Sequence, residues 1–460
     1  MSEAAGIEQH TIYPIPANER HGRARDLFTV WFGSNIMILT IVTGSLATLR
    51  FHLSLTAASL AILVGNLVGG IFMALHAAQG PQLGVPQMVQ SRGQFGSIGA
   101  IFVVALVVFM YLGFVASNLV LGGQSLHSIA GALSDQAGIA LIALLSFGAA
   151  AYGYDLIHTY ARWMSWICGA ALLTCFVWIF AVSGLPADVW LRGGVSLSGC
   201  LGMVSVGALW QIAYAPYVSD YSRYMPPVSG VWPAFWASYW GCVLGSTLPM
   251  LLGALLGLSV ANGNIVSGLT AAMVPISVAI ILVFSVGIGA TTAMNIYCGV
   301  LSSITVGQTF RPGWRPGRSA RIVLTVIFSL LALTMALLGA SNFMVNYEHF
   351  LTFLLCIMAP WTAINLVDFY LVRHGTYDVP SFFAPDGGVY GRYNATALAC
   401  YGVGIVIQVP FLATDVYTGR AAQALGGVDV SWLAALAVSG GSYLALARRP
   451  VPAHHSADAR

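Results

Sequence analysis

The sequence contains no lysine, and all 18 of its basic residues are arginines. Charged residues of both signs make up only 7% of the 460 residues, whereas 58% are hydrophobic. A soluble domain carries about a quarter charged residues, because its surface faces water. This composition excludes a soluble globular protein and predicts a chain whose solvent is lipid. The net charge of +3 is too small and too dispersed for nucleic-acid binding, which requires a clustered basic face.

The sequence also lacks the patterns of a metal or redox site. None of its seven cysteines forms a C-x-x-C pair, so they are expected to be small apolar packing residues. His76 and His127 are isolated, and no nucleophile–base set is present. We therefore expect no enzyme activity, no catalytic residues, no cofactor and no resident metal.

Long polar segments are missing as well. The polar stretches are the tail 1–26, the loops 79–96, 306–319 and 372–394, and the tail 448–460. None is long enough to bury a core of its own, so we expect no appended catalytic or regulatory domain. Residues 1–26 are predicted to form a cytoplasmic tail without a cleavable signal peptide. The turn residues Pro380, Pro385 and Asp386 predict an ordered loop over 372–394.

Long apolar runs dominate the rest of the chain. A bilayer core about 30 Å thick needs roughly 20 apolar residues in a helix. Twelve runs qualify, at 27–49, 54–78, 97–122, 136–153, 160–183, 198–218, 231–258, 272–305, 320–340, 348–371, 395–413 and 429–447. With the N-terminus inside, 15 arginines fall on the cytoplasmic side and only Arg50, Arg192 and Arg420 outside, as the positive-inside rule requires. The sequence thus predicts an all-α polytopic membrane protein with twelve transmembrane helices and both termini cytoplasmic.

Two of these spans carry signs of a broken helix. The first contains Gly33, Ser34 and Asn35 where apolar residues are expected, and the sixth contains Pro216. Proline removes a backbone donor and clashes one turn back, so the helix kinks or breaks there. Breaks at matching places in spans one and six indicate a five-plus-five inverted-repeat transporter. The alternative is an ordinary proline kink near a helix end.

Polar side chains inside other spans point to the kind of solute. Asn118 lies in span three, one turn after Phe114, and Asn295 lies in span eight. A single intramembrane Asn often only bonds to another helix, but two amides beside aromatic rings favour a binding site. Amides offer donors and acceptors without charge, and aromatic faces stack on flat ligands. No carboxylate lies at mid-membrane depth, because Asp220, Asp368 and the other acids cluster at span ends, where we expect solvated rim charges. These features predict a small, planar, uncharged solute.

At these residues the sequence resembles the nucleobase–cation symporter family, which includes purine/cytosine permeases and hydantoin and allantoin transporters. Motifs similar to the family's run along nearly the whole chain, in order: Glu19–Gly22, Trp31–Asn35, Gly84–Met88, Ser91–Gly96, Gly113–Asn118, Gly122–Gln124, Tyr214–Tyr224, Asn295–Tyr297 and Asp368–Tyr370. The resemblance implies alternating access in a LeuT-type core at 27–371, with repeats at about 27–183 and 198–371. It also implies two additional helices at 395–447, and location in the cell membrane, the inner membrane in bacteria.

The resemblance further implies a set of binding residues. Substrate contacts would come from Phe114 and Asn118 in span three, Tyr214 in span six, Asn295 in span eight, and Asn35 near the break in span one. Relatives often carry Trp at both aromatic positions. Phe and Tyr give smaller faces, which leaves the substrate's identity open.

The resemblance also implies a coupling cation, either sodium or a proton. Sodium-coupled relatives hold the ion with carbonyls of span one and hydroxyls of span eight. Ser34, Thr291 and Thr292 are the matching candidates. The alternative for a threonine in a membrane helix is a bond to its own backbone.

The leading hypothesis is import of a nucleobase, cytosine or a purine, by cation symport. The expected partners are a small neutral heterocycle, the cation and lipid. Allantoin, hydantoin, uracil or a vitamin heterocycle are alternatives in the same class. A passive channel or facilitator is the alternative from another class, and it would not accumulate solute above the outside concentration.

Overall fold

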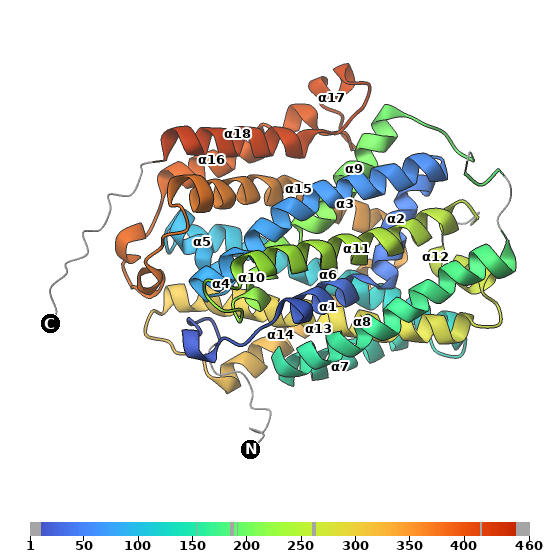
Figure 1. The fold of residues 1–460 in the computed structure, drawn as a ribbon, viewed down its shortest axis with the longest axis horizontal. Coiled ribbons are helices and arrows are strands. Elements are labelled where there is room, and N and C mark those ends of the chain that lie inside the picture. Colours follow the sequence, from blue (N-terminus) through green and yellow to red (C-terminus); the bar gives the residue numbers. More distant parts are fainter. Residues whose placement is uncertain are drawn as a thin grey trace.

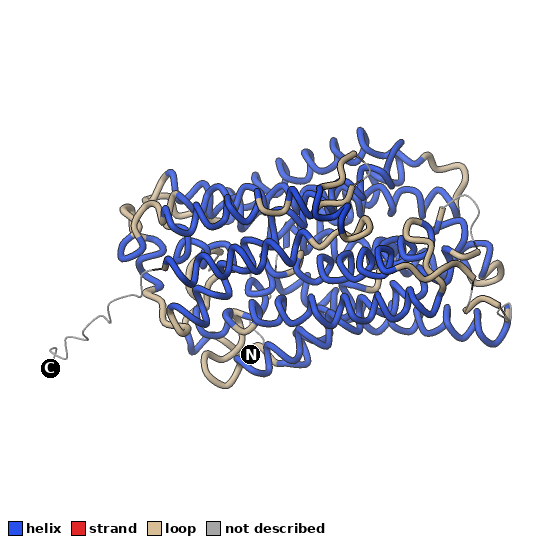
Figure 2. Tube along the Cα trace, turned by 90° about the horizontal axis from the view of Figure 1, so that it is seen from above, coloured by secondary structure: helices blue, strands red, loops and turns tan. Residues whose placement is uncertain are grey.

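The structure, a computed structural model, describes residues 11–152, 154–184, 188–190, 192–259, 264–414 and 416–447. The predicted tail 448–460 and residues 1–10 of the N-terminal tail lie outside this part. Its ordered elements are helices, and it contains no strand, only two isolated bridges, Leu53 with Gly194 and Ala413 with Thr418. Most helices run lengthwise beside one another, as Figure 1 and the view turned by 90° in Figure 2 show. We call the two ends of this bundle the α5 end and the α12 end, after the helices that lie there in Figure 1.

The first half of the bundle matches the first five predicted spans. Its helices are α1 (Ala24–Asn35), α2 (Ile38–Leu49), α3 (Leu55–Ala77), α6 (Gly99–Ile129), α7 (Asp135–Tyr152) and α8 (Tyr154–Val177), which continues as a π-helical turn (Trp178–Ser183). Between α3 and α6 lie the short helices α4 (Gln79–Leu83) and α5 (Gln87–Phe95).

The second half repeats this pattern and adds two helices. The helices of its spans are α9 (Leu197–Ile212), α10 (Ala215–Ser222), α11 (Val231–Gly257), α13 (Ser277–Phe310), α14 (Arg318–Gly339), α15 (Phe343–Leu366) with a π-helical end (Val367–Val372), α16 (Ala395–Val406) and α18 (Ser431–Leu446). The connections contain α12 (Ile265–Ala272), α17 (Arg420–Ala424) and 3-10 turns at Ala17–Glu19, Ala340–Asn342, Val379–Phe383, Gly388–Tyr390 and Val409–Phe411.

The helix lengths fit the twelve predicted crossings. Seven apolar stretches of the described chain are long enough to cross a membrane, and an eighth is the bent pair α1–α2. The longest, Arg318–Val372, contains both α14 and α15, and three shorter apolar helices complete the set. Span ends differ from prediction by several residues. The eighth span was predicted from 272, but α13 begins at Ser277 after the separate helix α12.

The first predicted break is present. Helix α1 ends at Asn35, α2 begins at Ile38, and the two are bent by 60°. Between them Ile36 and Met37 leave the helical conformation, with ψ angles of 81° and 166°. The freed Asn35 carbonyl accepts bonds from the Met37 amide at 3.0 Å and the Thr40 hydroxyl at 2.5 Å.

The second break follows from Pro216. Proline cannot donate to the carbonyl four residues earlier and clashes with it. That residue is Ile212, where α9 ends, and α10 begins at Ala215 after a turn at Ala213 and Tyr214. The interruption leaves one apolar stretch, Leu197–Ser222, so span six is interrupted but is not as sharply bent as span one.

Two acidic residues at the α5 end, Asp220 and Asp368, are buried, which corrects the expectation that they are solvated rim charges. Asp220 is 1% exposed and Asp368 is 0% exposed. The Asp220 carboxylate accepts a bond from the Gln87 backbone amide at 2.9 Å. Asp368 accepts bonds from Tyr443 at 2.8 Å, from Arg373 at 3.0 Å and from Tyr377.

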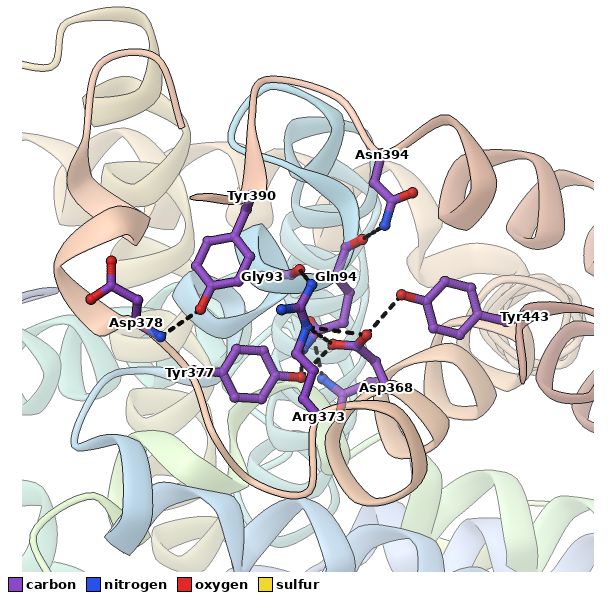
Figure 3. A network of polar contacts seen from close by, with 10 residues as sticks. Gly93, Gln94, Asp368, Arg373, Tyr377, Asp378, Tyr390, Asn394 and Tyr443 are labelled. Carbon is purple, nitrogen blue, oxygen red and sulfur yellow. Dashed lines mark hydrogen bonds and ion pairs between the residues drawn. The ribbon is translucent and has the colours of Figure 1, made fainter. Parts of the chain in front are cut away.

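Figure 3 shows how the Asp368 network joins distant segments. Tyr443 belongs to α18, Tyr377 to the loop after span ten, and Gln94, which donates to the Tyr377 hydroxyl at 3.0 Å, to α5. Burial, and then the Asp368 carboxylate, raise the pKa of Tyr377 well above its ordinary value. The phenol therefore stays protonated and donates to Asp368. The network fixes the loop 372–394 and the last helix to the core.

Candidate functional site

A small cavity lies where the two broken spans meet spans three and eight. It is small and partly open, with about 250 Å³ of space between its lining atoms, open solvent included. Its lining residues come from four spans: Met37, Phe114, Asn118, Trp210, Ala213, Tyr214, Tyr217, Thr291 and Asn295. Four of the five residues predicted to contact the substrate are therefore brought together, although they lie up to 181 residues apart in the sequence.

Helical spacing explains two walls of the cavity. Residues four apart lie on the same face of a helix, so Phe114 and Asn118 project together from α6. Thr291 and Asn295 do the same from α13, which packs along α6.

Aromatic rings form much of the cavity wall. The ring of Trp210 lies 6.2 Å from that of Phe114 and 6.2 Å from that of Tyr214, edge-on in both cases. The rings of Tyr214 and Tyr217 lie 5.4 Å apart. Such walls favour a flat, unsaturated ligand.

Three buried polar atoms of the cavity have no partner among the described residues. They are both amide atoms of Asn118 and the Oδ1 atom of Asn295. The Asn295 nitrogen donates to the Thr291 carbonyl at 3.0 Å, so its oxygen remains as an acceptor. Unpaired buried polar groups are costly in a fold. In this cavity they leave one acceptor on Asn295, and one acceptor and one donor group on Asn118, directed at whatever occupies it.

The fifth predicted contact, Asn35, is not among the lining residues. Its Oδ1 atom accepts bonds from Trp210 at 2.8 Å and from Ser246 at 2.9 Å. Its side chain thus points into the helix bundle rather than into the cavity.

The candidate cation residues are only partly brought together. The Thr291 hydroxyl donates to the Ser34 carbonyl at 2.8 Å, which joins span eight to the break in span one. The Thr292 hydroxyl instead donates to the Ile288 carbonyl of its own helix at 2.7 Å, and the Ser34 hydroxyl to the Trp31 carbonyl at 3.3 Å. Thr291 is therefore the candidate that bridges the two spans.

The sequence reading missed Trp210 and Tyr217. Both lie on the same side of span six as Tyr214, one turn before and one turn after it, so the spacing 210, 214, 217 was a signal for them. Trp210 looked like an ordinary apolar residue of a membrane helix.

A vestibule opens near the α12 end, separately from the cavity. It holds about 770 Å³ of empty space, and its lining includes Arg50, Leu209 and Glu348. Leu209 lines the vestibule while the next residue, Trp210, lines the cavity. A bond of 2.8 Å between the hydroxyls of Thr43 and Tyr347 also joins α2 to α15.

Two interrupted spans beside one small cavity are the arrangement of a secondary transporter of the LeuT type. The sequence pattern of the family described as "Permease for cytosine/purines, uracil, thiamine, allantoin" matches residues 14–434. The chain belongs to this family. It is therefore an integral membrane protein and a transporter rather than an enzyme.

Comparisons with individual proteins agree. The chain is 40% identical to the putative purine-cytosine permease YxlA of Bacillus subtilis over 442 residues, covering 96% of each chain. It is 24% identical to the purine-cytosine permease fcyB of Emericella nidulans, covering 97% of this chain and 89% of that one.

Among solved structures, the fold is similar to that of Mhp1, a nucleobase-cation-symport-1 family transporter, in a closed conformation with bromovinylhydantoin bound. The TM-score is 0.76 at 16% identity, covering 96% of this chain and 95% of that one. A Na+-coupled sialic acid symporter gives a TM-score of 0.63 at 10% identity, covering 93% and 89%. At these identities the likeness concerns the fold alone.

Proposed function

We propose that this protein imports a nucleobase, cytosine or a purine, by cation symport with alternating access. The observation that carries the proposal is the cavity beside both helix breaks, with aromatic walls and three unpaired amide atoms. A nucleobase is flat enough to stack on the rings, and its edge carries the N–H donors and ring acceptors that Asn118 and Asn295 need. The names of the purine-cytosine permease relatives support the same substrate class.

In this proposal Phe114 and Tyr214 hold the faces of the ring, and Asn118 and Asn295 bind its edges. The cavity contains no charged side chain among its lining residues, which suits a neutral solute. The breaks in spans one and six then allow the two ends of the bundle to open in turn around the bound ligand.

Binding and accumulation test the proposal. Cytosine or a purine should raise the melting temperature of the purified protein by mass action, whereas allantoin and hydantoin should not. Proteoliposomes with an imposed cation gradient should accumulate the same ligand above the outside concentration, and an ionophore should abolish this. Uptake that only equilibrates would identify a facilitator, and stabilisation by allantoin or hydantoin alone would change the substrate.

We further propose that Thr291, with the Ser34 carbonyl, contributes to the cation site. Replacing Thr291 with Val keeps the shape but removes the hydroxyl that bridges spans one and eight. Transport by Thr291→Val should require a higher cation concentration for half-maximal rate. The matched variant Thr292→Val should not, because that hydroxyl bonds within its own helix. Measuring uptake against sodium concentration and against pH also decides between sodium and a proton, and equal curves for both variants would contradict a site at Thr291.

A further inference from the structure

Behind the cavity lies a cluster of buried polar side chains, which we call the bundle cluster. Its members are Asn35, Asn66, Trp210, Gln211 and Ser246, and none is more than 2% exposed. They come from α1, α3, α9 and α11, so the cluster joins four helices. Gln211 donates to Asn66 at 2.7 Å and to the Ser246 hydroxyl at 3.2 Å.

Asn35 has no bonding capacity left for a ligand. A side-chain amide can accept two bonds at its oxygen and donate two from its nitrogen. The Asn35 oxygen accepts from Trp210 at 2.8 Å and from Ser246 at 2.9 Å. Its nitrogen donates to the Trp31 carbonyl at 2.7 Å and toward the Cys242 sulfur at 3.7 Å. The orientation of the amide is determined, because an indole N–H only donates and must meet the oxygen.

The consequence for Trp210 is that its only polar atom is turned away from the cavity. The indole still lines the cavity, with Phe114 and Tyr214 edge-on to it. It therefore presents only its hydrocarbon surface to whatever lies there. Loss of the acceptor on Asn35 would leave the buried indole N–H of Trp210 without a partner. Rotation of the indole toward the cavity or toward water would then be favoured, because the N–H could find a new acceptor there.

We propose that Asn35 is a positioning residue that holds the Trp210 ring as a fixed wall of the substrate cavity, so that this wall selects the size of the aromatic heterocycle that fits. Asn35 acts through Trp210 and does not touch the ligand. The proposal deepens the proposed function and rests on it.

A double-mutant cycle on the full-length purified protein tests this inference. The variants are Asn35→Ala, Trp210→Phe and the combination of both, and the readout is the Kd of radiolabelled cytosine and of radiolabelled adenine. Phenylalanine keeps a ring but has no N–H for Asn35 to hold. If Asn35 acts only through Trp210, its replacement should weaken binding about tenfold in the native background, and change the adenine-to-cytosine Kd ratio at least about threefold. In the Trp210→Phe background the same replacement should change either Kd by less than about twofold.

Asn66→Ala is the matched control. Asn66 is also a fully buried asparagine of the bundle cluster, but it bonds to Gln211 and the Ile62 carbonyl, not to Trp210. Its replacement should lower the melting temperature and leave the Kd ratio unchanged. If Asn35→Ala does not fold, Asn35→Leu, which preserves more of the side-chain volume, takes its place in the cycle.

Two results would overturn the inference while leaving the proposed function intact. One is a loss of binding on Asn35 replacement that persists undiminished in the Trp210→Phe background. The other is a change of the Kd ratio by Asn66→Ala equal to that by Asn35→Ala. Absence of cytosine and adenine binding by the unmodified protein would instead overturn the proposed function, and the inference with it.

Discussion

Buried asparagines of this protein differ in whether their amides are hydrogen-bonded, although each lies in an apolar span. The amides of Asn35 and Asn66 are bonded within the bundle cluster. Asn118 has neither amide atom bonded to a described residue, and Asn295 has a free oxygen. A buried amide stabilises the fold only when it is paired. The unpaired amides of Asn118 and Asn295 therefore cost stability in the ligand-free protein, which is what the proposed binding site predicts.

This difference predicts opposite effects on stability. Asn118→Leu removes two unpaired buried atoms, so the melting temperature of the ligand-free protein should stay the same or rise. Nucleobase binding should weaken about 10- to 100-fold, because polar ligand atoms left without partners cost about 1–3 kcal/mol. Asn295→Ala should weaken binding to a similar extent. Thermal melting and binding measured on the same samples check this, and a marked loss of stability in Asn118→Leu would contradict a ligand role for this amide.

At the scale of whole helices, glycines decide how closely the broken span one packs against span seven. A Cβ atom added at Gly253 of α11 would lie 1.8 Å from the Ile41 carbonyl oxygen, and one at Gly44 of α2 would lie 2.1 Å from that of Met250. Both clashes are with backbone, which cannot move without separating the helices. Close backbone approach through small residues is the usual way in which membrane helices associate.

We therefore expect Gly253→Ala to destabilise the protein, by an amount typical of overpacking, about 1–3 kcal/mol. Gly148→Ala is the matched control, because Gly148 is also a helical glycine but has nothing within 4 Å of an added Cβ. That control should be neutral or slightly stabilising, since alanine favours helices. Detergent melting curves of the two variants give the comparison, and equal melting temperatures would contradict the packing argument.

A hydrogen bond from the last helix, α18, holds the π-helical end of α15. Tyr443 of α18 donates to the buried Asp368 carboxylate at 2.8 Å. Tyr443→Phe should destabilise the protein by about 1–3 kcal/mol, because a buried carboxylate loses a donor. Tyr393→Phe, at an exposed position, should have no effect. A melting temperature that is unchanged in Tyr443→Phe would show that α18 does not hold the end of span ten.

At the scale of the whole molecule, the two ends of the helix bundle are packed differently. The α12 end holds the vestibule, whereas at the α5 end a chain of buried amides joins Asp220 to Asn365 through Gln87 and Gln79. Gln94 continues it to the Asp368 network. The hydrogen bonds at the α5 end must rearrange if the cavity is to open there, as alternating access requires.

The predicted orientation places the α5 end in the cytoplasm. A cysteine introduced at the exposed Val195 or Val416 should react with a membrane-impermeant thiol reagent in intact cells. A cysteine at the exposed Val228 should react only after permeabilisation. The unmodified protein provides the background from its own seven cysteines. Reaction of Val228→Cys alone in intact cells would mean that the protein is inserted the other way round.

Much of this architecture is determined by the sequence itself, because its causes are local. An apolar run of about 20 residues must form a helix in lipid, since every backbone polar group has to be bonded internally. Pro216 ends α9 four residues upstream, and the i, i+4 spacing places Phe114 with Asn118, and Thr291 with Asn295, on common faces. These features predict the spans and the breaks, and the family resemblance adds the proposed substrate contacts, four of which line one cavity.

What only the tertiary structure decides is which partner each polar group meets. Asn35 and Asn118 are both asparagines in similar apolar surroundings. The amide oxygen of Asn35 accepts bonds from Trp210 and Ser246, whereas the amide of Asn118 faces the cavity. The same holds for Asp368, which the sequence places at a span end but which Tyr443 and Arg373 enclose. Tyr443 and the partners of Asn35 come from segments 75 to 211 residues away, whereas Arg373 lies only 5 residues from Asp368. Neither the hydrophobic pattern nor the spacing of one helix contains this information, because it depends on how several helices pack together.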